Sequence, residues 1–342
     1  MTTIKDVAKA AGVSPTTVSL IINGKAKERR ISDETSDLVY KVMDELGYRP
    51  NMSARRLRAD VGIRPTIAFF WPADFRYNIL GSFIMHFQEA IEELQFDCEI
   101  VIRNYRNGQL EKSAEPILKN SYDGVIIGAM SMEDLAYMES IETRTPVVLL
   151  NRQSEKYSTV GSDNEKIGMQ VAKMMRLKGY TEAAVLASAS PWLATGARTQ
   201  AFFTACHTLG ISVRENWVLH GENTVAGGVK AAEDYCRLSD APKAILCDSD
   251  SMALGALYTF HHHGLKLPKD VELIAIQLLE DSYAKYAVPS ITTIAMPNKK
   301  IATEALSLLQ KLVQTPRQPA LHVTVEPKVV IRESFPFEGS LE

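Results

Sequence analysis

A cluster of small and hydroxyl-bearing residues near the N-terminus has the composition of a surface that contacts nucleic acid. Pro15, Thr16, Thr17 and Ser19 stand at the start of an expected helix. Side chains of this kind can hydrogen-bond base edges when a helix enters the major groove of DNA, and Thr17 and Ser19 could instead hold phosphates. An ordinary three-helix bundle would carry mainly Glu and Lys on this solvent-facing side. The pattern therefore favours a DNA-contacting helix over a plain bundle.

Three short helices are expected to position this cluster, with no strand in the first 47 residues. Apolar residues recur at i, i+3, i+4 and i+7 between residues 4 and 11, and Gly12 is a suitable residue to end that helix. Ser14 is a good N-cap for the next helix, which Pro15 would begin. A third apolar stripe runs over residues 32 to 47. Two short helices separated by three residues are typical of a helix-turn-helix.

The positive charge of the chain is concentrated in its first 64 residues. That segment carries 12 Lys or Arg against 8 Asp or Glu, a balance of +4, whereas the remainder carries 26 against 33, a balance of −7. A small basic head on an acidic body suits a polyanion as the partner of the head.

Residues 50 to 65 differ in composition from both of their neighbours. The segment begins and ends with proline, and its middle, NMSARRLRAD, is basic and weakly apolar. Ala54 and Leu57 stand three residues apart, which is too little apolar surface for an isolated helix but enough for one that folds against DNA and a partner hinge. The alternative is a solvated tether between domains. We expect a hinge here.

From residue 66 onward the chain alternates apolar strands with amphipathic helices. IAFFW, CEIVI, GVIIGAM and VVLLN supply strands first, and AAVLAS, AILCD and ELIAIQ resume the pattern. This alternation predicts parallel sheets covered by helices on both faces. Because about 270 residues exceed one comfortable open sheet, we expect an all-α head followed by an α/β body of two doubly wound lobes with a ligand cleft between them.

Composition narrows the class of protein further. The chain is 46% hydrophobic and 23% charged, as expected of a soluble globular protein, and it has no apolar run near the roughly 18 residues of a membrane span. The N-terminus lacks the apolar stretch of a signal peptide, so we expect a cytoplasmic protein without a membrane partner. The four cysteines include no Cys-x-x-Cys pair, and three consecutive histidines at residues 261 to 263 cannot share one metal from a helix, so we expect neither a metal nor a cofactor.

These features resemble the lactose-repressor family of bacterial transcription regulators over nearly the whole chain. The most specific matches lie in TIKDVAKAAGVSPTTVSLIING at residues 3 to 24, in ELGYRPN at residues 45 to 51 and in ARRLR at residues 54 to 58. The resemblance implies the domains of the chain: a helix-turn-helix domain over residues 1 to 49, a hinge over 50 to 65, and an effector-binding and dimerisation domain over 66 to 342.

The resemblance also implies which residues of the second helix contact bases. In such regulators this helix enters the major groove, which assigns that role to Pro15, Thr16, Leu20 and Asn23. Leu20 replaces a polar residue that is common in the family. Because leucine packs on a thymine methyl group but cannot donate to guanine, base preference at this position should shift toward A·T.

The hinge is implied to contact DNA as well. In the resembling regulators a leucine at the position of Leu57 wedges into the minor groove, and Arg55, Arg56 and Arg58 would neutralise phosphates. The expected DNA contacts are therefore Thr3, Ser14, Pro15, Thr16, Thr17, Ser19, Leu20, Asn23, Ser32, Asn51, Ala54, Arg55, Leu57 and Arg58.

The body resembles the periplasmic-binding-protein-like sensor domain of the family, through YDGVIIG, VGSDNEKIG and DSMALGAL among others. Its pocket departs from the family pattern: Ser249 stands where Asn is usual, Asn223 where an aromatic residue often lies, and Leu279 where a carboxylate commonly binds sugar hydroxyls. Without that carboxylate we expect a less polyhydroxylated ligand, unless Glu280 compensates. Asp163 could simply cap the next helix. The expected effector contacts are Trp71, Asp74, Phe75, Tyr77, Asp163, Arg198, Asn223, Ser249 and Leu279.

The function expected from these features is that of a repressor that binds a pseudo-palindromic operator as a homodimer and responds to a small-molecule effector. Two heads are expected because one small head makes few contacts. A small-molecule binding protein without DNA function and an α/β enzyme are the alternatives, and both leave the head unexplained. The chain has no G-x-G-x-x-G, phosphate loop or G-x-S-x-G, so we expect no catalytic activity.

Overall fold

The computed structural model describes residues 3–22, 26, 29, 31–46, 64–74, 76–189, 193–315 and 319–340. The hinge contacts predicted at Asn51, Ala54, Arg55, Leu57 and Arg58, together with Asn23 and Phe75, lie outside these residues.

The head consists of three helices, as the caps and the apolar spacing predict: α1 (Ile4–Ala10), α2 (Pro15–Ile22) and α3 (Asp33–Glu45). Its small core joins Val7, Val18 and Val39, which are all fully buried. Val18 brings the inner side of α2 into this core, and the hydroxyl of Tyr40 on α3 donates to the carbonyl of Ile21, 3.1 Å away. Both contacts hold α2 in place and leave its other side on the surface.

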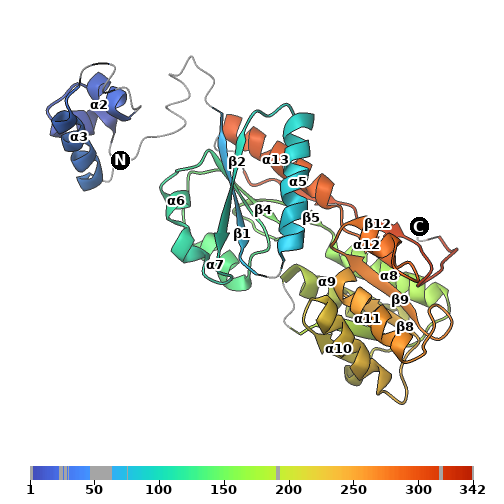
Figure 1. The fold of residues 1–342 in the computed structure, drawn as a ribbon. Coiled ribbons are helices and arrows are strands. Elements are labelled where there is room, and N and C mark those ends of the chain that lie inside the picture. Colours follow the sequence, from blue (N-terminus) through green and yellow to red (C-terminus); the bar gives the residue numbers. More distant parts are fainter. Residues whose placement is uncertain are drawn as a thin grey trace.

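Lobe 1 is a six-stranded parallel sheet with helices on both faces (Figure 1). The helices α5 (Tyr77–Glu93) and α13 (Asn298–Gln314) cover one face, and η1 (Leu110–Ser113), α6 (Glu115–Leu118) and α7 (Met132–Ser140) cover the other. The strands lie in the order β11 (His322–Val325), β5 (Ser158–Ser162), β4 (Val147–Leu150), β3 (Gly124–Ile127), β1 (Thr66–Pro72) and β2 (Glu99–Tyr105).

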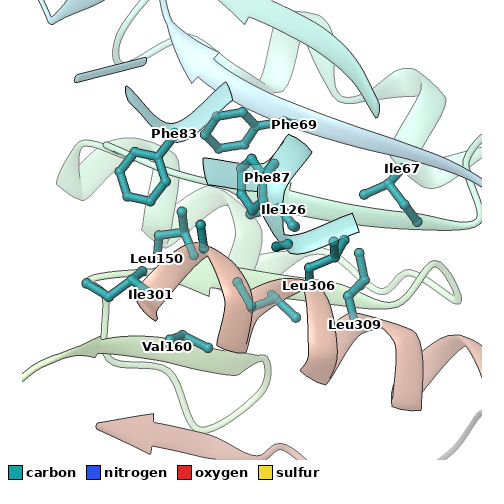
Figure 2. Close-up of a cluster of buried hydrophobic side chains, with 14 of the residues drawn as sticks. Ile67, Phe69, Phe83, Phe87, Ile126, Leu150, Val160, Ile301, Leu306 and Leu309 are labelled. Carbon is teal, nitrogen blue, oxygen red and sulfur yellow. The ribbon is translucent and has the colours of Figure 1, made fainter. Parts of the chain in front are cut away.

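The core of lobe 1 is built around aromatic side chains (Figure 2). Phe69 on β1 contacts Phe87 on α5 edge to face, with ring centroids 5.0 Å apart. Leu306 and Leu309 of α13 complete the same cluster, although they stand more than 200 positions later in the chain. The hydrophobic core of lobe 1 is therefore complete only when α13, a segment from the C-terminal part of the chain, has packed against the sheet.

Lobe 2 repeats this strand order with one difference. Its helices are α8 (Asn164–Leu177) and α9 (Leu193–Leu209) on one face, and α10 (Val225–Cys236) and α11 (Asp250–His262) on the other; two short helices, η2 (Glu215–Trp217) and α12 (Asp281–Lys285), complete the lobe. The strands lie in the order β12 (Lys328–Val330), β10 (Thr292–Ala295), β9 (Glu272–Gln277), β8 (Ala244–Cys247), β6 (Ala183–Ser188) and β7 (Val218–Gly221).

The sequence predicts parallel sheets throughout, but the edge strand β12 pairs antiparallel with β10. The three residues of β12 are exposed or half-buried at the edge of the sheet, and an otherwise parallel sheet often carries an antiparallel strand at its edge. The two α/β lobes themselves are confirmed.

The chain passes between the lobes at three places. It leaves lobe 1 after β5, returns after β10 and leaves again after β11. Over the described ranges, no helix is long and apolar enough to cross a membrane.

Candidate functional site

The predicted base-contacting residues lie together on the surface of α2. Pro15 and Thr16 are exposed, and Thr17, Ser19 and Leu20 are partly exposed. The hydroxyls of Ser14 and Thr17 lie 2.8 Å apart, and the N–H of Thr17 donates to the Ser14 hydroxyl over 3.0 Å. Ser14 is therefore the N-cap of α2, as its position predicts, and it also lies at the end of the helix that carries the predicted contacts.

Thr3 and Ser32 occupy corresponding places on the other two helices. The Thr3 hydroxyl accepts from the N–H of Asp6, whose carboxylate accepts from the N–H of Thr3, so the pair forms a capping box. The Ser32 hydroxyl accepts from the N–H of Thr35 at 3.2 Å. All three capping residues of the head are exposed and stand where partial positive charge at a helix N-terminus favours an anion.

A cavity of about 110 Å³ lies where the carboxyl ends of the two sheets face each other. This is the edge at which open α/β sheets bind ligands, and the volume is below the roughly 300–1,000 Å³ of pockets for drug-sized molecules. Residues of both lobes line it: Trp71, Arg76, Ile79, Phe83, Ala129, Leu150, Asn151 and Arg152 from lobe 1, Thr195, Arg198, Asn223, Ser251, Leu278 and Leu279 from lobe 2, and Met296 and Asn298 from the crossing after β10.

Four of the predicted effector contacts line this cavity. They are Trp71 at the end of β1, Arg198 on α9, Asn223 after β7 and Leu279 after β9. Because these positions come from four separate segments, only the fold brings them together.

Four others lie outside the cavity wall. Asp163 caps α8 by accepting from the N–H of Lys166 at 2.9 Å, and Ser249 is the fully buried N-cap of α11. Asp74 binds Arg76, and Tyr77 is more than half exposed at the start of α5. The roles of these four residues in effector binding stay predictions. For Asp163, the hydrogen bond from the N–H of Lys166 supports the alternative that it caps a helix.

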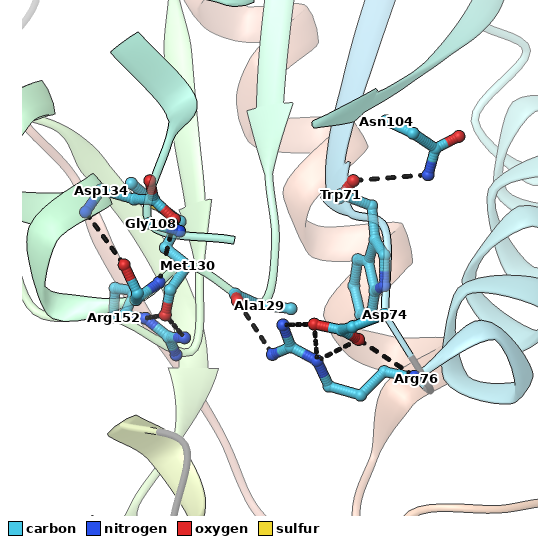
Figure 3. Close-up of polar contacts among 10 residues, drawn as sticks. Trp71, Asp74, Arg76, Asn104, Gly108, Ala129, Met130, Asp134 and Arg152 are labelled. Atoms are coloured by element: carbon cyan, nitrogen blue, oxygen red, sulfur yellow. Dashed lines mark hydrogen bonds and ion pairs between the residues drawn. The ribbon is translucent and has the colours of Figure 1, made fainter. Parts of the chain in front are cut away.

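Arg76 is held at the cavity by a carboxylate of its own lobe (Figure 3). Its Nε lies 2.8 Å from Asp74 Oδ1, its Nη2 lies 2.5 Å from Asp74 Oδ2, and its Nη1 donates to the carbonyl of Ala129 at 2.9 Å. The side chain of Arg76 is only 6% exposed. The Asp74 carboxylate thus neutralises one of the positive charges of the cavity wall.

Arg152 follows β4, and its hydrogen bonds to the described residues all go to main-chain oxygens. Its Nε and Nη2 donate to the carbonyl of Met130, and its Nη1 donates to the carbonyl of Asn151 at 2.6 Å (Figure 3). Burial lowers the pKa of Arg152 to about 10, and repulsion from Arg76 and Arg198 acts in the same direction. The guanidinium nevertheless stays charged at neutral pH.

Arg198 faces the cavity from lobe 2. Its Nε donates to Asn164 Oδ1 at 3.2 Å, whereas its two terminal nitrogens have no protein partner among the described residues. Burial lowers its pKa to about 10, against an opposing effect of the Asp248 carboxylate. Asp248 itself accepts from the N–H and hydroxyl of Ser188 at 2.6 and 3.1 Å.

A second buried carboxylate shapes the lobe 2 side of the wall. Asp250 accepts from the N–H groups of Leu278 and Leu279 at 3.2 and 2.9 Å, and so it fixes the segment that presents both leucines to the cavity. Burial raises the pKa of Asp248 and of Asp250 to about 6.

Two residues of the lobe 1 wall have unusual backbone angles. Ala129 and Asn151 follow β3 and β4 with φ values of 56° and 51°, in the left-handed region that L-residues seldom adopt. Strain of this kind is concentrated at functional sites. In this cavity it turns the carbonyls of Ala129 and Asn151 toward Arg76 and Arg152 respectively.

Sequence reasoning missed Arg76 and Arg152, as well as Thr195, Ser251 and Asn298. A signal for two of them exists in the chain, because Arg76 stands in the loop after β1 and Arg152 comes two residues after β4. Both positions lie at carboxyl ends of parallel strands, where ligand contacts are expected.

Comparisons with known proteins assign the two parts of the chain. A model of bacterial regulatory proteins of the lacI family matches residues 3–51, and a model of a periplasmic binding protein-like domain matches residues 172–335. The HTH-type transcriptional repressor PurR of Vibrio campbellii is 28% identical over 98% of this chain and 98% of its own length.

Two solved structures extend the likeness to the fold. A LacI family transcription regulator from Clostridium acetobutylicum is 31% identical, with a TM-score of 0.75 over 79% of this chain and 100% of its own. A complex of the transcriptional regulator CelR with cellobiose is 25% identical, with a TM-score of 0.69 over 98% of this chain and 100% of its own. With its helical head and its two α/β lobes, the chain belongs to the LacI family and is a DNA-binding transcriptional regulator that responds to an effector.

Proposed function

We propose that the chain represses transcription as a homodimer on a pseudo-palindromic operator, and that a small molecule in the interlobe cavity sets its operator affinity. The observation that carries this proposal is the arrangement of α2. Val18 fixes the inner side of the helix in the core of the head, and Pro15 and Thr16 stand exposed on the other. A helix presented in this way can enter a major groove without any change in the head.

Within the head, the bases are contacted by Pro15, Thr16, Leu20 and Asn23. Backbone phosphates bind to hydroxyls and helix N-termini of the head, at Thr3, Ser14, Thr17, Ser19 and Ser32. These phosphate contacts set the register of the head on the duplex.

In this proposal, the segment of residues 50 to 65 binds in the minor groove. Leu57 wedges between base pairs, Arg55 and Arg58 neutralise phosphates, and Asn51 and Ala54 lie along the groove. The proposed domains are the head over residues 1–49, this hinge, and the effector-binding and dimerisation domain over 66–342.

The position of the cavity supports coupling between effector and operator. Trp71 and Arg152 belong to lobe 1, whereas Arg198 and Leu279 belong to lobe 2, so a ligand that contacts both walls favours one arrangement of the lobes over another. We also propose that the protein acts in the cytoplasm, without a cofactor and without catalysing a reaction.

Fluorescence anisotropy tests this function. The purified chain is titrated against tiled duplexes from its own promoter and against scrambled duplexes, at low and at physiological salt. We expect roughly a thousandfold preference for one promoter duplex and a steep loss of affinity with salt. Equal affinity for promoter and scrambled duplexes, with the extracted small molecules of the host cell added, would contradict the proposal.

Leu57→Ala tests the hinge separately. We expect specific operator affinity to fall by at least about tenfold, because a methyl group cannot wedge a base step open. Leu57→Met is the matched control and should retain most of the affinity. Circular dichroism should show the same fold for both variants, and an operator affinity unchanged in Leu57→Ala would remove the minor-groove wedge from the proposal.

A further inference from the structure

The charge of the interlobe cavity is strongly unbalanced. Three arginines, Arg76, Arg152 and Arg198, line it, and no Asp or Glu stands among its described lining residues. Arg76 forms an ion pair with the carboxylate of Asp74. Within the described part of the chain, Arg152 and Arg198 form no salt bridge, although both are more than nine-tenths buried.

Two buried guanidinium groups that form no salt bridge with a described carboxylate are costly to keep, although Asp248 at longer range offsets part of the cost for Arg198. Removing a charge from water costs several kcal/mol unless an opposite charge and hydrogen bonds compensate for it. The lowered pKa of both groups reflects this cost, and for Arg152 it also reflects repulsion from Arg198 across the gap between the lobes. A negative charge placed between the two groups would remove both penalties.

The hydrogen-bonding groups of the cavity point to the same kind of ligand. Among the described residues, neither the terminal nitrogens of Arg198 nor the buried indole N–H of Trp71 has an acceptor. Leu279 lines the wall with an apolar side chain, which accepts no hydrogen bond from a ligand hydroxyl. Donors therefore outnumber charged acceptors, which suits an anion better than a neutral polyol.

We propose that the effector is a small organic anion, a carboxylate or a phosphate monoester, whose charged group binds between Arg152 and Arg198. Its body lies against the apolar part of the wall, at Trp71, Phe83, Leu279 and Met296. Because Arg152 belongs to lobe 1 and Arg198 to lobe 2, the anion replaces repulsion between the lobes by attraction to a shared charge. This inference rests on the proposed function, in that it takes the cavity as the effector site.

Calorimetric titration of the full chain tests the charge of the ligand. The probes are aromatic and short-chain carboxylates and sugar phosphates, each paired with its neutral amide or unphosphorylated sugar, and cellobiose as a neutral disaccharide. We expect at least one anion to bind at least about tenfold more tightly than its neutral counterpart. Whether the tightest probe is a carboxylate or a phosphate identifies the anionic group.

Substitutions locate the binding site. Arg152→Gln and Arg198→Gln should each weaken the best anion by at least about tenfold, because each removes a charged donor. Arg214→Gln is the matched control: Arg214 is a half-exposed arginine paired with Glu182 and Asp240 outside the cavity wall, and its loss should leave anion binding unchanged.

Leu279→Asp covers the case in which a buried arginine cannot be replaced without unfolding. Leu279 is only half-buried, so an aspartate there is compatible with the fold, and its carboxylate would compete with the anion for the same guanidinium groups. We expect this variant to lose anion binding while circular dichroism shows an intact fold.

Two results would overturn the inference: neutral probes that bind as tightly as every anion, or anion binding that persists in Arg198→Gln and Leu279→Asp. Operator anisotropy on the same protein separates this failure from that of the proposed function. Specific operator binding that responds to a neutral compound and to no anion leaves the regulator intact and removes only the anionic effector.

Discussion

The two lobes share one strand order but are packed in different ways. In each, the first five strands are parallel and the helices cover both faces. Lobe 1 packs side chains against side chains, with Phe69, Phe83 and Phe87 in mutual ring contact. Lobe 2 instead brings main chains together, since Gly228 and Gly255 let α10 and α11 approach closely. The same topology thus accommodates helices packed through their side chains and helices packed through their main chains.

The lobes also differ in charge at the cavity. Lobe 1 pairs its Arg76 with Asp74 at the wall. Lobe 2 buries Asp248 and Asp250 behind its wall, and the terminal nitrogens of its Arg198 have no partner in the part of the chain that the structure describes. Buried carboxylates hold loops in both lobes, since Asp134 of lobe 1 accepts from the N–H groups of Gly108 and Leu110. In lobe 2, however, the loop that Asp250 holds presents Leu278 and Leu279 to the cavity. Three predictions test this contrast, from the largest expected effect to the smallest.

Gly228→Ala and Gly124→Ala make the same change in the two lobes. A Cβ at Gly228 would lie 2.0 Å from the carbonyl oxygen of Met252, whereas at Gly124 it would meet the side chain of Leu309 at 2.8 Å. Since main chain cannot give way as a leucine can, we expect Gly228→Ala to cost about 3 kcal/mol or more and Gly124→Ala about 1 kcal/mol. Urea unfolding followed by circular dichroism measures both, and equal costs would contradict the difference in packing.

Asp250→Asn tests the buried carboxylates through pH. The pKa of Asp250 is raised to about 6 in the fold, against about 3.9 in an unfolded chain. The folded state therefore holds the proton more tightly, so its stabilising effect is complete below about pH 4 and is lost as pH rises through about 6. Asp250 should make the chain about 2 to 3 kcal/mol less stable at pH 7 than at pH 4.

The measurement is the difference between wild type and Asp250→Asn in free energy of unfolding across pH 4 to 7. That difference should change with pH by the same 2 to 3 kcal/mol, because only the wild type titrates at this position. Parallel pH profiles for the two proteins would show that Asp250 does not titrate in this range.

Asp163→Ala has the smallest expected effect and decides between two interpretations of that residue. As the N-cap of α8, Asp163 should contribute about 1 kcal/mol to stability, and Asp163→Ser should keep most of it. Thermal unfolding measures both variants. If both instead lose response to the effector at unchanged stability, Asp163 is a ligand contact rather than a cap.

The head could be predicted from the sequence because its signals are local. Ser14 lies next to the helix that it caps, and Gly12 lies next to the helix that it ends, with a positive φ of 66°. The α/β pattern of the body is equally local, since the seven strands that the sequence predicts are mostly apolar runs, whereas polar strands such as β5 and β11 are not predicted. Antiparallel β12 escaped prediction because its pairing depends on where the chain returns, and its own composition gives no sign of it.

The cavity could be predicted only in part, because its members meet only in the fold. Trp71, Arg198, Asn223 and Leu279 were identified through the family resemblance, which already contains long-range information. Arg152 was missed because an arginine after a strand is ordinary in sequence. Its importance comes from Arg198, 46 positions away in the chain and on the opposite wall.

The triple passage of the chain between the lobes has a consequence for its synthesis on the ribosome. Lobe 1 requires α13 and β11, so its sheet cannot be completed until residue 325 has emerged, after almost all of lobe 2. The head, by contrast, has its three helices within residues 4–45 and can fold as soon as they leave the exit tunnel. Each new molecule therefore carries a folded head during most of its translation, well before the two lobes are complete.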